Sequence, residues 1–166
     1  MTPNPEAVES LPLGGTTSLD RDQELLVVVA ARLRRLNMIV LGALDASLTF
    51  GQYRTLGRVA AGATSLSELT AQAGVTLPTM SETVNGLVRR GLIETRQNEA
   101  DHRSVVLYAT EAGAAAAAAG DAALRGVIET LTGELSNDQR AGLANSLQVI
   151  YDAATVYLTE HLSSKS

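Results

Sequence analysis

The segment from Ser65 to Tyr108 constrains the fold most, because turn and capping residues divide it into several short elements. Ser65 and Glu68 have the spacing of a capping box, in which each side chain binds a backbone N–H of the other residue at the start of a helix. Gly74 can adopt the left-handed conformation that ends many helices, and Pro78 suits the first turn of a new helix. The pattern predicts two short helices joined by a turn of about four residues.

A β-hairpin is predicted directly after the second of these helices, which we expect Thr76 to cap. Residues 92–96 alternate as a strand, residues 105–108 form the return strand, and the polar residues 97–103 form the tip between them. A helix, a turn, a second helix and a hairpin in this order form a winged helix-turn-helix. In such folds the second helix enters the major groove of DNA and the hairpin is the wing.

Both ends of the chain carry long apolar stripes at helical spacing. The first stripe runs from Asp20 to Leu44, and the second follows a capping box formed by Ser136 and Gln139. Because stripes of this length exceed what one small lobe needs, we expect them to pair between two copies of the chain; packing within one chain is the alternative. The residues predicted at this dimer interface are Leu25, Val29, Leu147, Ile150, Ala154 and Leu158.

A further helix is predicted to begin after Thr110, a good N-cap, and to run through an alanine block to Thr132. The expected fold is therefore mainly α with a small β-hairpin wing: a winged helix-turn-helix lobe plus long terminal dimerisation helices. We expect four parts: a flexible tail rich in proline and glycine at residues 1–19, a dimerisation helix at 20–47, the winged helix-turn-helix at 48–110, and a linker helix with the C-terminal dimerisation helix at 111–166.

Composition limits the kinds of function that this chain can have. It has no cysteine, which excludes disulfides and thiolate metal sites. No apolar run approaches the roughly 20 residues that span a bilayer, so we expect a cytoplasmic protein without a membrane partner. The net charge is −5, but residues 50–110 hold six arginines against five acidic residues and carry +1. This segment can bind nucleic acid locally, with a modest electrostatic contribution.

The second predicted helix has one apolar and one polar side. Met80, Val84, Leu87 and Val88 cluster on the side expected to face the core. Thr, Ser, Asn and Arg side chains hydrogen-bond base edges or phosphates, Glu accepts from cytosine N4, and Pro contacts thymine methyls. We therefore predict that the polar side reads DNA, although a random helix would also have a solvated polar face. The predicted residues are Pro78, Thr79, Ser81, Glu82, Asn85 and Arg89.

The hairpin is predicted to supply a second group of DNA contacts from its tip, namely Arg96, Asp101, His102 and Arg103. An arginine on such a hairpin can enter the narrow, negatively charged minor groove. Because Asp101 cannot attract phosphate, its expected role is to orient an arginine through a charge-assisted hydrogen bond.

Residues 48–113 resemble the MarR (multiple antibiotic resistance regulator) family. The resemblance is carried by LTFGQYRTLGRVA, by LSELTAQAGVTLPTMSETVNGLVRRGLIETR and, most specifically, by the wing signature DHRSVVLYATEAG. It implies a homodimer that binds a near-palindromic operator in double-stranded DNA, usually as a repressor and often released by a small aromatic or anionic effector. Carried over to this sequence, it places the recognition helix at residues 77–90, the wing arginine at Arg103 and its partner acid at Asp101.

Two positions depart from the family pattern, because Glu82 and Gly86 stand where many members have basic residues. A glutamate facing DNA is repelled unless it meets a base donor or a neighbouring arginine such as Arg89. These departures and the acidic net charge favour a rival hypothesis, a winged-helix dimeric protein-interaction adaptor that has lost DNA binding. Salt-sensitive DNA binding would favour the regulator, and no binding at low salt would favour the adaptor.

A few other residues have two interpretations each. Tyr53 and Arg54 could line an effector pocket for an aromatic acid, but we favour Tyr53 as a core residue and Arg54 as a phosphate contact. Asn37 could meet an effector or hydrogen-bond the backbone. His102 and His161 are far apart and lack a carboxylate cluster, so no metal site is predicted. We predict neither an enzyme nor a cofactor.

Overall fold

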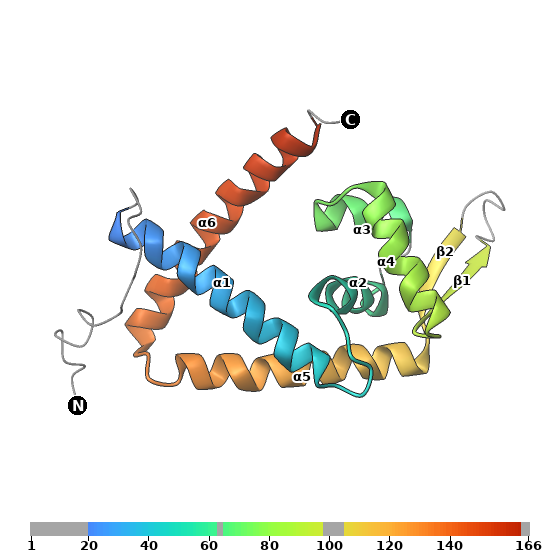
Figure 1. The fold of residues 1–166 in the computed structure, drawn as a ribbon, viewed down its shortest axis with the longest axis horizontal. Coiled ribbons are helices and arrows are strands. Elements are labelled where there is room, and N and C mark those ends of the chain that lie inside the picture. Colours follow the sequence, from blue (N-terminus) through green and yellow to red (C-terminus); the bar gives the residue numbers. More distant parts are fainter. Residues whose placement is uncertain (1–19, 63–64, 98–104, 164–166) are drawn as a thin grey trace. The chain divides into compact units, whose positions relative to one another are not determined.

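A computed structural model describes residues 20–62, 65–97 and 105–163, which form six helices and two strands (Figure 1). In chain order these are α1 (Arg21–Gly42), α2 (Phe50–Ala60), α3 (Leu66–Ala73), α4 (Leu77–Arg89), β1 (Ile93–Gln97), β2 (Val105–Ala109), α5 (Glu111–Thr132) and α6 (Asn137–Ser163). This order confirms the predicted mainly α fold with a small β-hairpin. The predicted tail at residues 1–19 lies outside the described residues. Within the described ranges, no helix is both long and apolar enough to span a bilayer.

The described residues fall into two units, one ending at Leu36 and the other beginning at Asn37. The first unit contains the part of α1 up to Leu36, and none of its described residues is buried. Leu26, Val27 and Val29 are all exposed. The apolar stripe of this unit is therefore not covered within the unit.

The first helix ends before its apolar stripe does. α1 ends at Gly42, whereas the predicted stripe continues to Leu44. The Leu48 N–H donates to the Leu41 carbonyl oxygen, 3.0 Å away, and Ser47 has a positive φ of 41°. Both leucines are buried, so packing of this turn outweighs continuation of the helix.

Side-chain caps set the starts of the first two short helices. Ser65 and Glu68 form the predicted capping box at α3, with hydrogen bonds of 3.0 and 3.1 Å. Gly74 ends α3 with a φ of 62°. Thr49 and Gln52 form a second capping box at the start of α2. These local interactions explain why the helices begin where they do.

The start of α4 differs in one respect from the prediction. Thr76 is the N-cap residue, as predicted, but its side chain makes no capping hydrogen bond. Its hydroxyl lies 2.9 Å from the Thr79 hydroxyl instead. Pro78 occupies the first turn, as predicted. The pair of hydroxyls replaces the cap and orients the Thr79 side chain.

The strands form an antiparallel hairpin, with Ile93 opposite Ala109 and Gln97 opposite Val105. Ile93 is buried, whereas Gln97 is exposed. The end of the hairpin at Ile93 therefore packs into the core, whereas the end of β1 at Gln97 is exposed to solvent.

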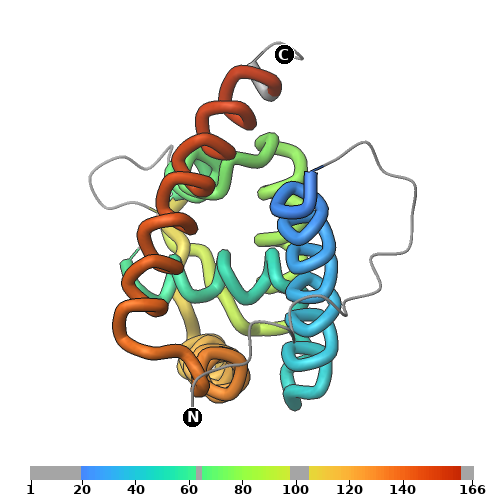
Figure 2. Tube along the Cα trace, turned by 90° about the vertical axis from the view of Figure 1, so that its left-hand side faces the viewer, coloured from blue at the N-terminus to red at the C-terminus, as the bar shows by residue number. Residues whose placement is uncertain are grey.

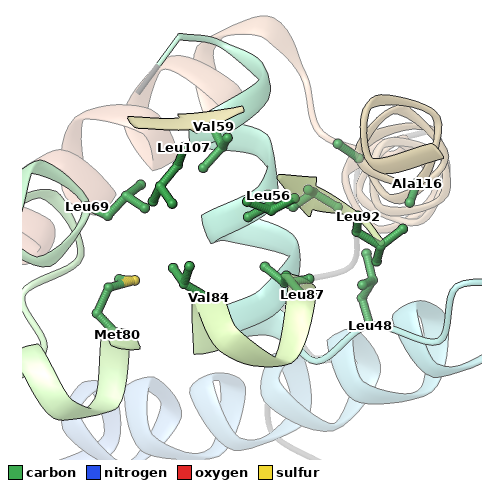
Figure 3. Close-up of a cluster of buried hydrophobic side chains, with 12 residues drawn as sticks. Leu48, Leu56, Val59, Leu69, Met80, Val84, Leu87, Leu92, Leu107 and Ala116 are labelled. Carbon is green, nitrogen blue, oxygen red and sulfur yellow. The ribbon is translucent and has the colours of Figure 1, made fainter. Parts of the chain in front are cut away.

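The core lies where α2 packs against α3, α4, α5 and the hairpin (Figure 3). Leu56 of α2 and Leu87 of α4 are fully buried, and burial of each leucine contributes about 2 kcal/mol. Met80 and Val84 of α4 are also buried, and Val88 packs against the cluster while half-buried. The predicted inner side of α4 thus faces the core.

α5 joins this core through small residues. Thr110 caps the helix by accepting a hydrogen bond of 3.0 Å from the Gly113 N–H. A Cβ at Gly113 would overlap the Leu92 carbonyl oxygen, and a Cβ at Gly120 would lie 2.7 Å from the Tyr53 ring. The beginning of α5 therefore lies too close to the lobe for a larger residue at either glycine.

α6 begins at the predicted capping box. The Ser136 N–H donates to Gln139 Oε1 at 2.9 Å, and the Gln139 N–H donates to Ser136 Oγ at 3.3 Å. The helix then runs without interruption, from orange to red in Figure 2. All residues from 137 to 161 are exposed, so no other described part of the chain covers the apolar stripe of α6.

Candidate nucleic-acid interface

α4 carries apolar side chains on one side and polar side chains on the other. Met80, Val84 and Leu87 face the core. The exposed residues on the opposite side are those that the sequence suggested as DNA contacts, and we call them the α4 polar face: Pro78, Thr79, Glu82, Asn85 and Arg89. An exposed helix face that follows a short helix and a tight turn has the arrangement of a major-groove reader.

Hydrogen bonds on α4 orient several of these side chains. Ser81, also a predicted contact, is half-buried at the edge of the polar face, and Asn85 Nδ2 donates to its hydroxyl at 3.5 Å. The Thr83 hydroxyl donates to the Thr79 carbonyl oxygen at 2.9 Å. The Asn85 amide is therefore held near Ser81, while its carbonyl oxygen can still accept a hydrogen bond.

The C-terminal end of α4 is basic and meets a residue that the sequence did not single out. Arg89 and Arg90 are both exposed, and Arg90 Nη1 donates to Gln52 Oε1 at 3.4 Å. The same oxygen accepts from the Thr49 N–H at 3.1 Å in the α2 capping box. The Thr49–Gln52 spacing signals a cap, but no local pattern shows that Gln52 lies beside Arg90, 38 residues away.

Arg96 lies within β1, in the segment predicted as a strand and one residue before the strand ends. Residues two apart on a strand share a face, and Arg96 accordingly forms an ion pair with Glu94. Its guanidinium also lies over the Tyr108 ring, 4.8 Å from the centroid. The side chain is thus held against the strand. The other predicted wing contacts lie outside the described residues: Asp101, His102 and Arg103.

A pocket of about 260 Å³ lies at α2 and α5. Its lining among the described residues is Tyr53, Arg54, Gly57, Arg58, Ala61 and Asp121. The Tyr53 hydroxyl donates to Asp121 Oδ1 at 2.5 Å, and Arg58 Nη2 donates to the Gln72 carbonyl oxygen at 3.1 Å. Asn37, the other predicted effector contact, is half-buried in α1 and is not among these lining residues.

The pocket bears on both interpretations of Tyr53 and Arg54. Tyr53 packs against the core cluster while its hydroxyl faces the pocket. Arg54 is exposed and lines the pocket. Because two residues advance about 200° around a helix, Arg54 lies on the side of α2 away from Gln52 and α4. The geometry therefore favours a pocket role for Arg54 over a phosphate contact beside α4.

Two pKa values in this pocket are shifted. Burial, followed by the hydrogen bond to Asp121, raises the pKa of the Tyr53 phenol above its ordinary value. Burial, followed by repulsion from Arg54, lowers the pKa of the Arg58 guanidinium. Since the two guanidinium groups repel each other, an anion bound between them would be stabilised.

The residues predicted at the dimer interface lie on α1 and α6. Leu25 is half-buried, and the others are exposed: Val29, Leu147, Ile150, Ala154 and Leu158. Apolar side chains that remain exposed along a long helix are typical of a surface that another molecule covers.

Residues 46–104 match the family model of the MarR family. No curated protein sequence matches the chain. Among solved structures, FabT of Streptococcus pneumoniae in complex with DNA has a TM-score of 0.74 and 20% identity, over 81% of this chain and 95% of that chain. The reduced form of MarR from E. coli has a TM-score of 0.66 and 25% identity, over 81% and 98% of the two chains.

A third similar structure, the S. aureus MepR–DNA complex, has a TM-score of 0.67 and 19% identity, over 79% of this chain and 94% of that chain. These coverages show that the shared fold includes more than the segment that matches the family model. The family whose model matches and the similar structures are those of transcriptional regulators rather than of enzymes. Residues 46–104 are therefore similar to the MarR family, and the chain shares the winged helix-turn-helix fold of these structures.

Proposed function

We propose that this protein is a sequence-specific transcriptional regulator that binds double-stranded DNA as a homodimer. The observation that carries the proposal is the α4 polar face, which is exposed on a helix whose other side is fixed in the core. Asn85 and Arg89 offer the amide and guanidinium groups that read bases and phosphates. Arg103 in the wing signature is proposed to enter the adjacent minor groove.

Exposed apolar side chains support the homodimer. Leu147, Ile150 and Leu158 lie on α6, where they are not covered within the described chain. A two-fold symmetric dimer places two recognition helices about one helical turn of DNA apart, which suits a near-palindromic operator. Repression is the simplest result of such binding when the operator overlaps a promoter.

The pocket at α2 and α5 supports release of the DNA by a small effector. Arg54 and Arg58 supply positive charge, and the Tyr53 phenol supplies a ring. A small aromatic anion matches this combination. Because α2 also packs against α4, a ligand at the pocket can bias the position of the DNA-reading helix.

Selection of bound duplexes from a random DNA pool at low salt tests the function without assuming an operator. The parent should enrich a two-fold symmetric motif. Asn85→Ala should change the preferred base at one position in each half-site, since a bidentate contact contributes about 1–3 kcal/mol of discrimination. Asn145→Ala, which removes an exposed amide from α6, is the matched control and should enrich the parental motif.

The wing contact is tested in the same selection with Arg103→Ala, which should weaken binding to all sequences alike. Enrichment by this variant equal to that of the parent would contradict the wing assignment. If the parent enriches no sequence at low salt, the DNA-binding proposal is wrong and the adaptor hypothesis takes its place.

A further inference from the structure

Gln52 has a fixed orientation at the junction of α2 and α4. Its Oε1 accepts from the Thr49 N–H at 3.1 Å and from Arg90 Nη1 at 3.4 Å. Because both interactions use the carbonyl oxygen, the amide nitrogen points away from them with two hydrogens to donate. This nitrogen lies 3.7 Å from the point where a Cβ would stand on Gly86 of α4. The capping box of α2 therefore presents an amide donor above the backbone of the DNA-reading helix.

Two guanidinium groups lie beside this amide. Arg89 Nη2 is 4.0 Å from the same point above Gly86, and Arg90 is the partner of Gln52. Among the described residues, no carboxylate forms an ion pair with Arg89 or Arg90. Glu82 shares this helix and lies one turn before Gly86, about 6 Å along the axis from Gly86 and about 10 Å from Arg89, at a rise of 1.5 Å per residue. Hydrogen-bond donors and positive charge are therefore concentrated at the C-terminal end of α4.

Neither the backbone conformation of residue 86 nor its packing against other described residues explains why this residue is glycine. Its φ is not positive, and a Cβ would meet only ordinary contacts at 3.7 and 4.0 Å. Glycine inside a helix is less favourable than alanine, so the residue weakens α4 without an internal reason. Glycine is also the residue that lets another molecule approach the backbone closely. The space above Gly86 is bordered by the Gln52 amide nitrogen and the Arg89 guanidinium, and Arg90 is hydrogen-bonded to the same Gln52 side chain.

We propose that Gln52, Arg89 and Arg90 bind one backbone phosphate of DNA in the space above Gly86, and we call this the Gln52 phosphate site. Two guanidinium charges outweigh the partial negative charge at the helix C-terminus, and planar guanidinium groups suit phosphate oxygens. A phosphate contact fixes the register of the helix on DNA without reading sequence. The site thus explains how a recognition helix with an acidic Glu82 and no side chain at residue 86 is still held on DNA.

This inference rests on the proposed DNA-binding function, and the variant Gln52→Glu tests it specifically. Glutamate keeps the acceptor for the Thr49 N–H and for Arg90, so the capping box and the fold should persist. It replaces the amide donor with a carboxylate that repels phosphate. Gln139→Glu is the matched control, because Gln139 has the same capping role at the start of α6 and the change adds the same charge.

Binding is measured by fluorescence anisotropy with two labelled duplexes, one from the selection and one of unrelated sequence, between roughly 50 and 200 mM salt. Gln52→Glu should lower affinity about tenfold on both duplexes and reduce the slope of log K against log salt by about one. Gln139→Glu should keep the parental affinity and slope. Equal thermal midpoints for the two variants would show that both retain the fold.

Gly86→Leu provides a second test, because its side chain fills the space above residue 86. It should lower affinity and reduce the salt slope by about one while α4 remains folded. The Gln52 phosphate site is overturned if Gln52→Glu binds both duplexes like Gln139→Glu with the same slope. If the parent itself binds neither duplex at low salt, the proposed function fails, and the phosphate site fails with it.

Discussion

α4 and α6 both carry an apolar stripe, but among the described residues only the stripe of α4 is buried. Leu87 of α4 is 0% exposed, whereas Leu147 and Leu158 of α6 are 53% and 51% exposed. The two helices therefore differ in whether other described residues cover their apolar side chains. α4 is held by its own lobe and is free to present a polar face, while α6 has an apolar face that requires another surface.

The unequal burial also separates the roles of the two regions. Each leucine that becomes buried contributes about 2 kcal/mol. Burying the exposed stripe of α6 against another protomer would therefore stabilise a dimer substantially. The short elements of the lobe, by contrast, gain their stability locally from caps and from the core around Leu56. A lobe that folds on its own contacts and helices that need a partner fit a dimer whose DNA-reading parts are separate from its interface.

Leu147→Glu should have the largest effect, because it places a carboxylate in the apolar stripe of α6 and should weaken the dimer. Burying the unpaired charge and losing the leucine costs about 2–3 kcal/mol for each protomer. Since both protomers of a symmetric dimer carry the change, the dimer dissociation constant should rise by roughly three to four orders of magnitude. Sedimentation velocity over a range of protein concentrations measures this change.

Asn145→Glu is the control for charge, because it adds the same carboxylate two residues away on the opposite side of α6. Asn145 is exposed, so this variant should sediment as the parent does. A Leu147→Glu protein that sediments as a dimer at the parental concentration would show that the α6 stripe is not the interface.

Gly113→Ala and Gly126→Ala compare a closely packed and an open position of the same helix, since α5 begins against the lobe and continues beyond it. A Cβ at Gly113 would overlap the Leu92 backbone, whereas a Cβ at Gly126 meets nothing within 4 Å. Gly113→Ala should lower the free energy of unfolding by about 2–3 kcal/mol because the helix must shift. Gly126→Ala should raise it by about 0.5–1 kcal/mol through helix propensity. Urea denaturation of both variants, compared with the parent, measures the two effects, and equal changes would contradict the close packing at Gly113.

Local spacing was enough to predict much of the lobe. The Ser65–Glu68 capping box, the left-handed Gly74 and the buried side of α4 all depend on residues within one or two turns of each other. The same holds for the capping box at Ser136. Thr76 is the N-cap residue as predicted, but its hydroxyl interacts with the Thr79 hydroxyl instead of a backbone N–H.

The remaining features depend on contacts between residues far apart in sequence. Gln52 meets Arg90 across 38 residues, and Tyr53 meets Asp121 across 68. No periodicity in the sequence records which sides of α2 face α4 and α5. For this reason the sequence left two interpretations of Arg54 open, a phosphate contact and a pocket shared with Tyr53, and the tertiary arrangement places both residues at one pocket.

The titration of Tyr53 should show the smallest effect. It tests whether the lobe shields the Tyr53 phenol from solvent as it shields the core side chains. Burial first, and then the hydrogen bond to Asp121, raises the pKa of the Tyr53 phenol. A raised pKa means that the fold favours the neutral phenol. Its stabilising contribution is therefore complete below the ordinary tyrosine pKa and is lost as the pH rises through the raised value.

Absorbance at alkaline pH follows tyrosine ionisation, and the difference between the parent and Tyr53→Phe isolates Tyr53. Its midpoint should lie above that of a free tyrosine. Asp121→Asn should move it only part of the way back, because burial is the larger cause and remains in this variant. A midpoint at the ordinary value would mean that solvent reaches the phenol freely, and that the contact between α2 and α5 is looser than the one between α2 and α4.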